Sequence, residues 1–175
     1  VGKFGKAAVA AGSVIAGSAV VSTLKDLVTE GLRYASSLGE EAKQLGISTK
    51  ALQQYRMAAT QAGLSQDEMD QALGKLSRTM GDALNGAKTP SQAFEKLGID
   101  IKAFVASGKD AGDLMPLVAE GLKNMHSPAE RAATLVDLFG RNGQKLMPLL
   151  SEGARGVDEL RKAADRFGVV MDDQM

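Results

Sequence analysis

Residues 127–150 read Ser-Pro-Ala-Glu-Arg-Ala-Ala-Thr-Leu-Val-Asp-Leu-Phe-Gly-Arg-Asn-Gly-Gln-Lys-Leu-Met-Pro-Leu-Leu, which predicts two helices joined by one turn. Ser127 is expected to cap the first helix, with Glu130 completing a capping box. Glycine and asparagine tolerate turn conformations, so the turn is placed at residues 140–143. The residues expected to pack this αα-hairpin against a partner surface are Leu135, Phe139, Gly140, Gly143, Leu146, Leu149 and Leu150.

The composition favours an all-α fold. The chain has 175 residues, enough for one ordinary domain or for a small domain with an extended arm. It contains five Phe, two Tyr and no Trp, which argues against an aromatic-rich β-sandwich or barrel core. Its 20 glycines and four prolines are enough to separate many short helices.

The residue types present argue against catalysis and against cofactor or metal binding. With 21 basic and 21 acidic residues, the chain has no net charge to attract nucleic acid, and it has no Cys. His126 is the single histidine, so a catalytic triad or a metal site is not expected. Glu40 and Glu41 are adjacent, about 100° apart on a helix, and therefore do not converge as a glycosidase pair would. We predict a protein without enzymatic activity and without a specific nucleic-acid site.

The N-terminal part, residues 1–45, is predicted to be a long helical arm. It contains 18 consecutive uncharged residues, from Ala7 to Leu24. As a helix this run extends about 27 Å, close to the roughly 30 Å of a bilayer core. Most of its residues are Ala, Gly or Ser, which gain little from membrane insertion. Packing against partner helices and insertion into a membrane both remain open for residues 7–24.

The arm also shows apolar residues at alternating spacings of three and four, the pattern of a coiled-coil or helix-bundle seam. The charged residues between positions 24 and 45 all avoid this stripe. Small residues in such a seam allow helices to approach closely. The predicted oligomer seam consists of Leu24, Val28, Gly31, Ala35, Leu38, Ala42 and Leu45.

Residues 46–175 are predicted to form a module of short amphipathic helices joined by glycine-rich turns. Its expected helix starts are Ser48, Ser65, Thr89-Pro90, Asp100, Asp113 and Ser127. Pro116 falls in the first turn after Asp113, where a missing amide costs little. The last helix carries Val157, Leu160, Ala164 and Phe167 and is expected to end at Gly168.

The order of these elements resembles that of phage tail tape measure proteins. The resemblance covers roughly residues 45–170, after an Ala/Gly-rich helix, and its strongest segment is Leu138-Phe139-Gly140-Arg141-Asn142-Gly143 followed by Leu149-Leu150. The other segments are Leu45-Gly46-Ile47-Ser48, Ala62-Gly63-Leu64-Ser65, Phe94-Glu95-Lys96-Leu97-Gly98-Ile99 and Arg131 to Asp137. Members of that family are usually far longer, so the chain is expected to be an internal fragment.

The resemblance implies a structural protein of a bacteriophage or prophage tail. Tape measure proteins set tail length while tail tube protein polymerises around them, and assembly chaperones cover them beforehand. At infection they leave the tube ahead of the DNA. The implied partners are tail tube protein, tail tip or baseplate proteins, assembly chaperones and the host membrane at ejection. The seam of the arm also favours self-association, for example as a trimer. The implied locations are the host cytoplasm during assembly, then the tube lumen or tip, then the host envelope. The alternative function is that of a membrane-active pore or translocation module.

Overall fold

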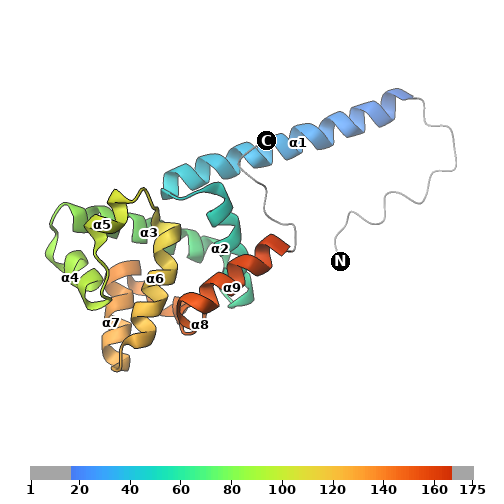
Figure 1. Ribbon diagram of the computed structural model, residues 1–175. Coiled ribbons are helices and arrows are strands. Elements are labelled where there is room, and N and C mark those ends of the chain that lie inside the picture. Colours follow the sequence, from blue (N-terminus) through green and yellow to red (C-terminus); the bar gives the residue numbers. More distant parts are fainter. Residues whose placement is uncertain (1–16, 167–175) are drawn as a thin grey trace. The chain divides into compact units, whose positions relative to one another are not determined.

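The computed structural model describes the backbone of residues 17–166 and the side chains of residues 29–166 (Figure 1). Every regular element in this part of the chain is helical, which confirms the predicted all-α fold. The elements are α1 (Gly17–Leu45), α2 (Thr49–Gln61), α3 (Gln66–Leu84), α4 (Lys88–Lys96), α5 (Ile101–Ala106), α6 (Ala111–Asn124), α7 (Pro128–Phe139), the 3₁₀ helix η2 (Arg141–Leu146), α8 (Met147–Leu150) and α9 (Gly153–Arg166).

The chain divides into two compact units, residues 1–37 and 38–175. The second unit, called the module below, therefore begins within α1. The prediction placed its start at residue 46. Leu38 and Ala42 explain the difference, because they are 2% and 1% exposed in the core.

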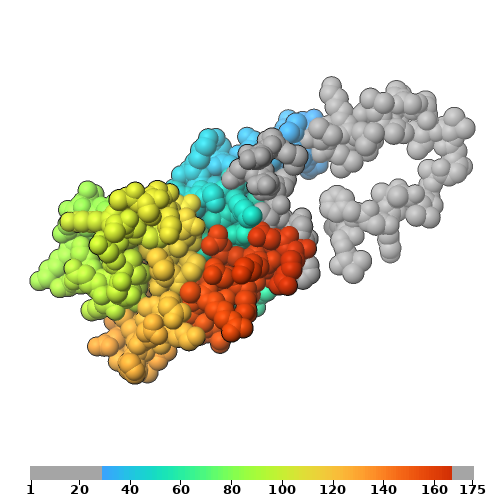
Figure 2. All heavy atoms as spheres, viewed as in Figure 1, coloured from blue at the N-terminus to red at the C-terminus, as the bar shows by residue number. Residues whose placement is uncertain are grey.

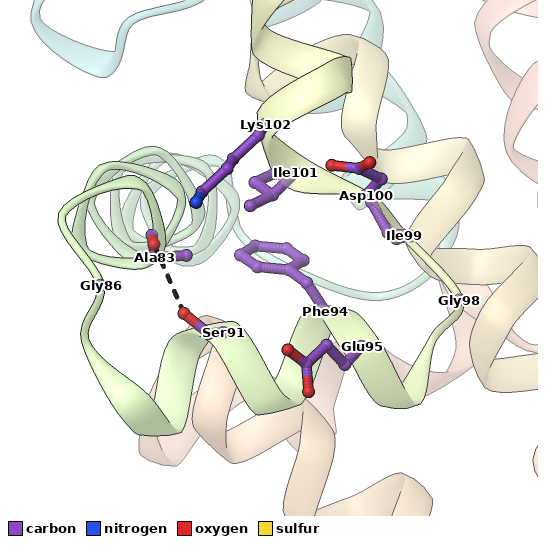
Figure 3. Close-up of a pocket in the computed structure, with 10 residues that line it drawn as sticks. All are labelled: Ala83, Gly86, Ser91, Phe94, Glu95, Gly98, Ile99, Asp100, Ile101 and Lys102. Atoms are coloured by element: carbon purple, nitrogen blue, oxygen red, sulfur yellow. Dashed lines mark hydrogen bonds between the residues drawn. The ribbon is translucent and has the colours of Figure 1, made fainter.

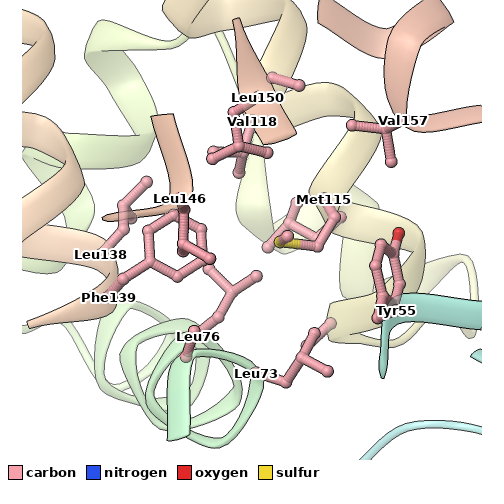
Figure 4. Packing of buried hydrophobic residues seen from close by; sticks show 14 of the residues in the cluster. Tyr55, Leu73, Leu76, Met115, Val118, Leu138, Phe139, Leu146, Leu150 and Val157 are labelled. Carbon is pink, nitrogen blue, oxygen red and sulfur yellow. The ribbon is translucent and has the colours of Figure 1, made fainter. Parts of the chain in front are cut away.

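Helix α3 is central to the module and contacts α2, α4, α5, α6, α7 and η2. Helix α6 packs against α9, and the two lie side by side in Figures 1 and 2. The space between these helices is filled by aliphatic and aromatic side chains. Figure 4 shows this core, to which α3 contributes Leu73 and Leu76 and α6 contributes Met115 and Val118. Burial of this apolar surface is the main force that holds the helices together.

Most helix starts agree with the prediction because each is set by a cap within a few residues. The Ser48 side chain accepts a hydrogen bond from Ala51 N, and Asp100 accepts one from Ala103 N. Ser65 and Glu68 form the complete predicted capping box. At Ser127, Glu130 N donates to Ser127 Oγ at 3.3 Å, but the Glu130 carboxylate accepts no hydrogen bond from Ser127 N. Only half of the predicted capping box is therefore present.

Two predicted starts are wrong. Helix α4 begins at Lys88, so Pro90 is its third residue rather than part of its start. The backbone N–H groups in the first turn of a helix have no partner within the helix. Proline, which has no N–H, is therefore tolerated throughout that turn and does not mark the first residue of the helix. Helix α6 is capped by Asp110, whose Oδ1 accepts from Gly112 N and Asp113 N. The predicted cap, Asp113, instead supplies the return bond of this capping box.

Pro116 consequently lies in the second turn of α6, not in its first. Proline has no N–H to donate to the carbonyl four residues earlier, which belongs to Gly112. The Tyr55 hydroxyl, on α2, donates to that carbonyl at 2.6 Å. Tyr55 is fully buried, and this burial raises the pKa of its hydroxyl above the ordinary value. A side chain from another helix therefore replaces the hydrogen bond that the proline removes.

Replacing Tyr55 with phenylalanine is expected to lower the free energy of unfolding by about 1–3 kcal/mol, because the Gly112 carbonyl is then buried without a donor. Pro116→Ala restores a helix N–H at the right position. The loss caused by Tyr55→Phe should therefore be smaller in a Pro116→Ala background, as measured by urea denaturation of all four members of the cycle. Equal losses in both backgrounds would show that the proline and the tyrosine are not coupled.

An arginine joins the end of α1 to α2 and α3. Arg56 donates two hydrogen bonds to Asp70, at 3.0 and 2.6 Å, and one to Glu41 at 2.5 Å. The hydrogen bond to Asp70 is the largest effect raising the pKa of Arg56. Glu40 lies apart, 3.7 Å from the Lys43 ammonium. The adjacent glutamates thus contact different cations.

Hydroxyl groups on α3 also satisfy the carbonyl ends of two other helices. Ser77 Oγ donates to Leu45 O at 2.5 Å, and the Thr79 hydroxyl is shared between Lys75 O at 2.8 Å and Leu138 O at 3.0 Å. The last carbonyls of a helix have no partner within the helix, so these contacts provide one. The ends of α1 and α7 are thereby fixed to α3.

The hairpin differs from the prediction in its second half. Helix α7 ends at Phe139 and is capped by Gly140, whose φ of 78° lies within the predicted turn. The chain then continues as η2 and the four-residue α8, in place of one α-helix. Pro148 explains the difference, because it cannot donate to Gln144 O and its ring would clash there in an α-helix. Met147 N donates to Gln144 O instead, with 3₁₀ spacing.

Candidate interaction surfaces

The predicted hairpin residues lie in the core of the module. Leu135 and Leu150 are 0% exposed, and Phe139 is 5% exposed. Leu146 and Leu149 are also buried, and Gly140 is half-buried. Gly143 is buried where α7 passes so closely that a Cβ atom there would lie 2.3 Å from Leu135 O. These residues hold the fold and offer no surface to a ligand.

The predicted oligomer seam is divided between the two units. Leu38 and Ala42 are buried in the module, and Leu45 packs against its core. The spacing correctly identified an apolar stripe, but these residues pack within their own chain and are not available to a partner. Spacing alone does not distinguish the two kinds of burial.

The part of the seam that precedes the module is more exposed. Gly31 is exposed and Ala35 is half-buried, while the side chains of Leu24 and Val28 lie outside the described residues. Beside this stripe, Leu32 is 67% exposed and Tyr34 is 58% exposed. We call Gly31, Leu32, Tyr34 and Ala35 the arm surface.

A hollow of about 520 Å³ lies where the end of α3 meets α4 and α5 (Figure 3). The Phe94 ring and the Ile101 side chain face each other in it, and Ser91 Oγ donates to Ala83 O at 3.4 Å. The charged residues in its lining are Glu95, Asp100 and Lys102. Because the lining carries both acidic and basic groups, it favours neither an anionic nor a cationic ligand.

A second hollow, of about 260 Å³, lies between α3 and the hairpin. Its charged residues are Lys75 and Arg78 from α3, Arg141 from η2, and Glu68 from the start of α3. Leu64, Phe139 and Leu146 contribute apolar atoms to the lining. We call this feature the basic hollow. Phe139, Gly140 and Leu146 of this lining were predicted as packing residues of the hairpin. Its cations were not predicted as a site, because they are widely separated in the sequence.

Glu68, which lines the basic hollow, forms an ion pair with Lys145 at 2.5 Å. The Lys145 ammonium and the Ser65 backbone N–H lower the pKa of Glu68 from 4.5 to about 2. Because the folded pKa lies below the unfolded value, these contacts stabilise the fold above about pH 4.5. That stabilisation is lost as the pH falls from about 4.5 through about 2.

Lys145→Met is expected to raise the pKa of Glu68 and to reduce the loss of stability between pH 4.5 and pH 2. A carboxylate NMR titration gives the pKa, and urea denaturation at several pH values gives the stability. Lys123→Met, on α6, is a matched control outside this ion pair and should leave the pKa of Glu68 unchanged. An unchanged pKa in Lys145→Met would contradict the assignment.

The described residues contain no group of three or more His, Cys, Asp or Glu side chains placed to hold a metal ion. None of their helices is both long enough and apolar enough to cross a membrane. The uncharged run at residues 7–24 extends outside this range, because residues 7–16 are not described.

The described residues form a set of helices packed around one hydrophobic core. The profile of residues in the chain matches the family described as phage-related minor tail protein over residues 3–140. The chain belongs to this family. No curated protein and no solved structure matches the chain.

Membership of the phage-related minor tail protein family gives the chain a structural role in a phage tail and places it in the tail of the virion. The match includes α1–α7 and ends at Gly140. The segment η2, which carries Arg141 of the basic hollow, lies just beyond it. The family therefore identifies the protein class but assigns no role to the hollow.

Proposed function

We propose that the chain is a segment of a tape measure protein, which sets the length of the phage tail. The observation that carries this proposal is the family match, which runs through both the helical arm and the module. The arm supplies a rigid spacer, since the 29 residues of α1 extend about 44 Å as a helix. A helix gives a fixed rise per residue, so tail length can follow the number of residues.

The proposal includes the partners that such a role requires. Tail tube protein surrounds the segment, tail tip or baseplate proteins hold its end, and assembly chaperones cover it in the host cytoplasm. The exposed Leu32 and Tyr34 side chains support self-association through the arm surface, for which a trimer is our proposed stoichiometry. At genome ejection the protein leaves the tube ahead of the DNA and reaches the host envelope.

The test is an insertion into the gene in its own phage or prophage. A helical insertion of 28 residues between Ser36 and Ser37 preserves the heptad spacing and adds about 42 Å of helix. Electron microscopy should show tails longer by about this amount. A Gly/Ser insertion of the same size after Gly108, which has a positive φ between α5 and α6, is the control and should leave tail length unchanged. Assembled tails of unaltered length in the arm variant would refute the proposal.

The alternative is a membrane-active pore or translocation module, favoured by the uncharged run at residues 7–24. Leakage from vesicles by the full chain, compared with a chain lacking residues 7–24, separates the two functions. Leakage that requires the run supports the alternative. Absence of both leakage and vesicle binding removes it.

A further inference from the structure

The basic hollow brings together cations from two segments. Lys75 and Arg78 are one turn apart on α3, while Arg141 begins η2, more than sixty residues later. Arg78 and Arg141 are exposed, and Lys75 is half-buried. Phe139 and Leu146 contribute the apolar part of the lining and are themselves packed into the core. The result is a charged rim above buried core residues.

These cations have no carboxylate within ion-pair distance among the residues that the structure describes. The one acid in the lining, Glu68, is held by Lys145 and by Ser65. The next acids along the two segments, Asp82 on α3 and Asp137 on α7, do not line the hollow. With three cations and one carboxylate, the lining carries a formal charge of 3 − 1 = +2. The hollow is therefore complementary to an anionic group.

The form of the lining distinguishes between two anionic partners. A single-stranded nucleic acid is normally bound by exposed aromatic faces on which bases stack. Phe139, the one aromatic residue of the lining, is 5% exposed and offers no such face. The balanced total of 21 basic and 21 acidic residues also supplies no long-range field for a polyanion. The cations of the rim are instead suited to the carboxylates of an acidic polypeptide segment.

We propose that the basic hollow is a docking site for an acidic segment of another tail protein, whose Asp or Glu side chains meet the cations of the rim. Arg78 and Arg141 bind the carboxylates, since guanidinium groups pair well with them. This site does not depend on the tape measure role, because any structural tail protein needs neighbours.

The test uses the full chain, labelled with ¹⁵N, and a short amphipathic peptide built from Leu, Glu and Ala. Addition of this peptide should shift the amide signals of Arg78, Arg141 and Asn142. The double variant Arg78→Glu, Arg141→Glu should bind the peptide at least about tenfold more weakly, because like charges then face each other. Lys96→Glu, Lys102→Glu carries the same charge change on α4 and α5 and should bind normally.

Two other probes test whether binding depends on negative charge and whether the partner is a nucleic acid. The same peptide with Lys in place of Glu should not bind, and neither should an oligothymidylate. Equal binding of the Lys peptide would overturn the charge argument, and binding of the oligonucleotide instead of the acidic peptide would make the partner a nucleic acid. No shift at millimolar acidic peptide would also overturn the proposal. Circular dichroism verifies that each variant is folded.

Discussion

Replacing Phe139 with alanine is expected to lower the free energy of unfolding of the module by about 3–5 kcal/mol. The ring is 5% exposed and belongs to the core cluster. Figure 4 shows it in the space that Leu138 and Leu146 also enter. Its removal loses buried apolar surface and leaves a cavity. The surrounding helices cannot fill this cavity easily, because both α7 and η2 are fixed by their own contacts.

Urea denaturation followed by far-ultraviolet circular dichroism measures this loss. Leu32→Ala is the control, because Leu32 is 67% exposed on the arm and contributes little buried surface. It should change the stability of the module by less than about 0.5 kcal/mol. Equal midpoints for wild type and Phe139→Ala would show that the ring does not support the core.

Gly143→Ala is expected to lower the free energy of unfolding by about 2–4 kcal/mol, although it adds only one methyl group. The new Cβ atom would lie 2.3 Å from Leu135 O and 2.9 Å from Leu135 C. Both atoms belong to the backbone of α7, so no side-chain rotation relieves the clash. The hairpin must open or α7 must bend.

Gly81→Ala is the matched control for this substitution. Gly81 lies within α3, and a Cβ atom there would meet nothing within 4 Å. Alanine is the better helix former, so this change should raise stability by about 0.5–1 kcal/mol. The two substitutions should therefore have opposite effects in the same denaturation experiment. A loss of stability in both would mean that close approach at Gly143 is not the cause.

The helix limits were largely predictable, because the signals that set them are local. A cap such as Ser48, Ser65 or Asp100 bonds to an amide within three residues, and a glycine stop acts on its own backbone angles. These local signals could not decide whether Asp110 or Asp113 caps α6, because a helix could begin after either aspartate. Asp110 also accepts a bond from Ser48 N at 3.0 Å, a contact between segments distant in the sequence.

The candidate surfaces were much less predictable. Apolar residues spaced three and four apart identify the buried face of α1. They do not reveal that Leu38 and Ala42 pack within their own chain. The basic hollow joins Lys75 to Arg141, and nothing local relates these two residues. Pro116 was the one residue whose position in the sequence indicated a contact with a distant segment. A proline within a helix leaves a carbonyl without its helix donor, so that another group must donate to it. The effect of Pro116 was missed because the helix start was placed three residues too late.

The hydroxyl contacts of α3 have a consequence for how the module unfolds. Leu45 O and Leu138 O are bonded to Ser77 and Thr79, which are 32 and 59 residues away in the sequence. Neither helix end can keep its last turn in place once α3 separates from it. We therefore expect less local fraying at these ends, with amide hydrogens that exchange more slowly than those of helix ends without such a contact. The serine and threonine of one helix thus make the unfolding of three helices cooperative.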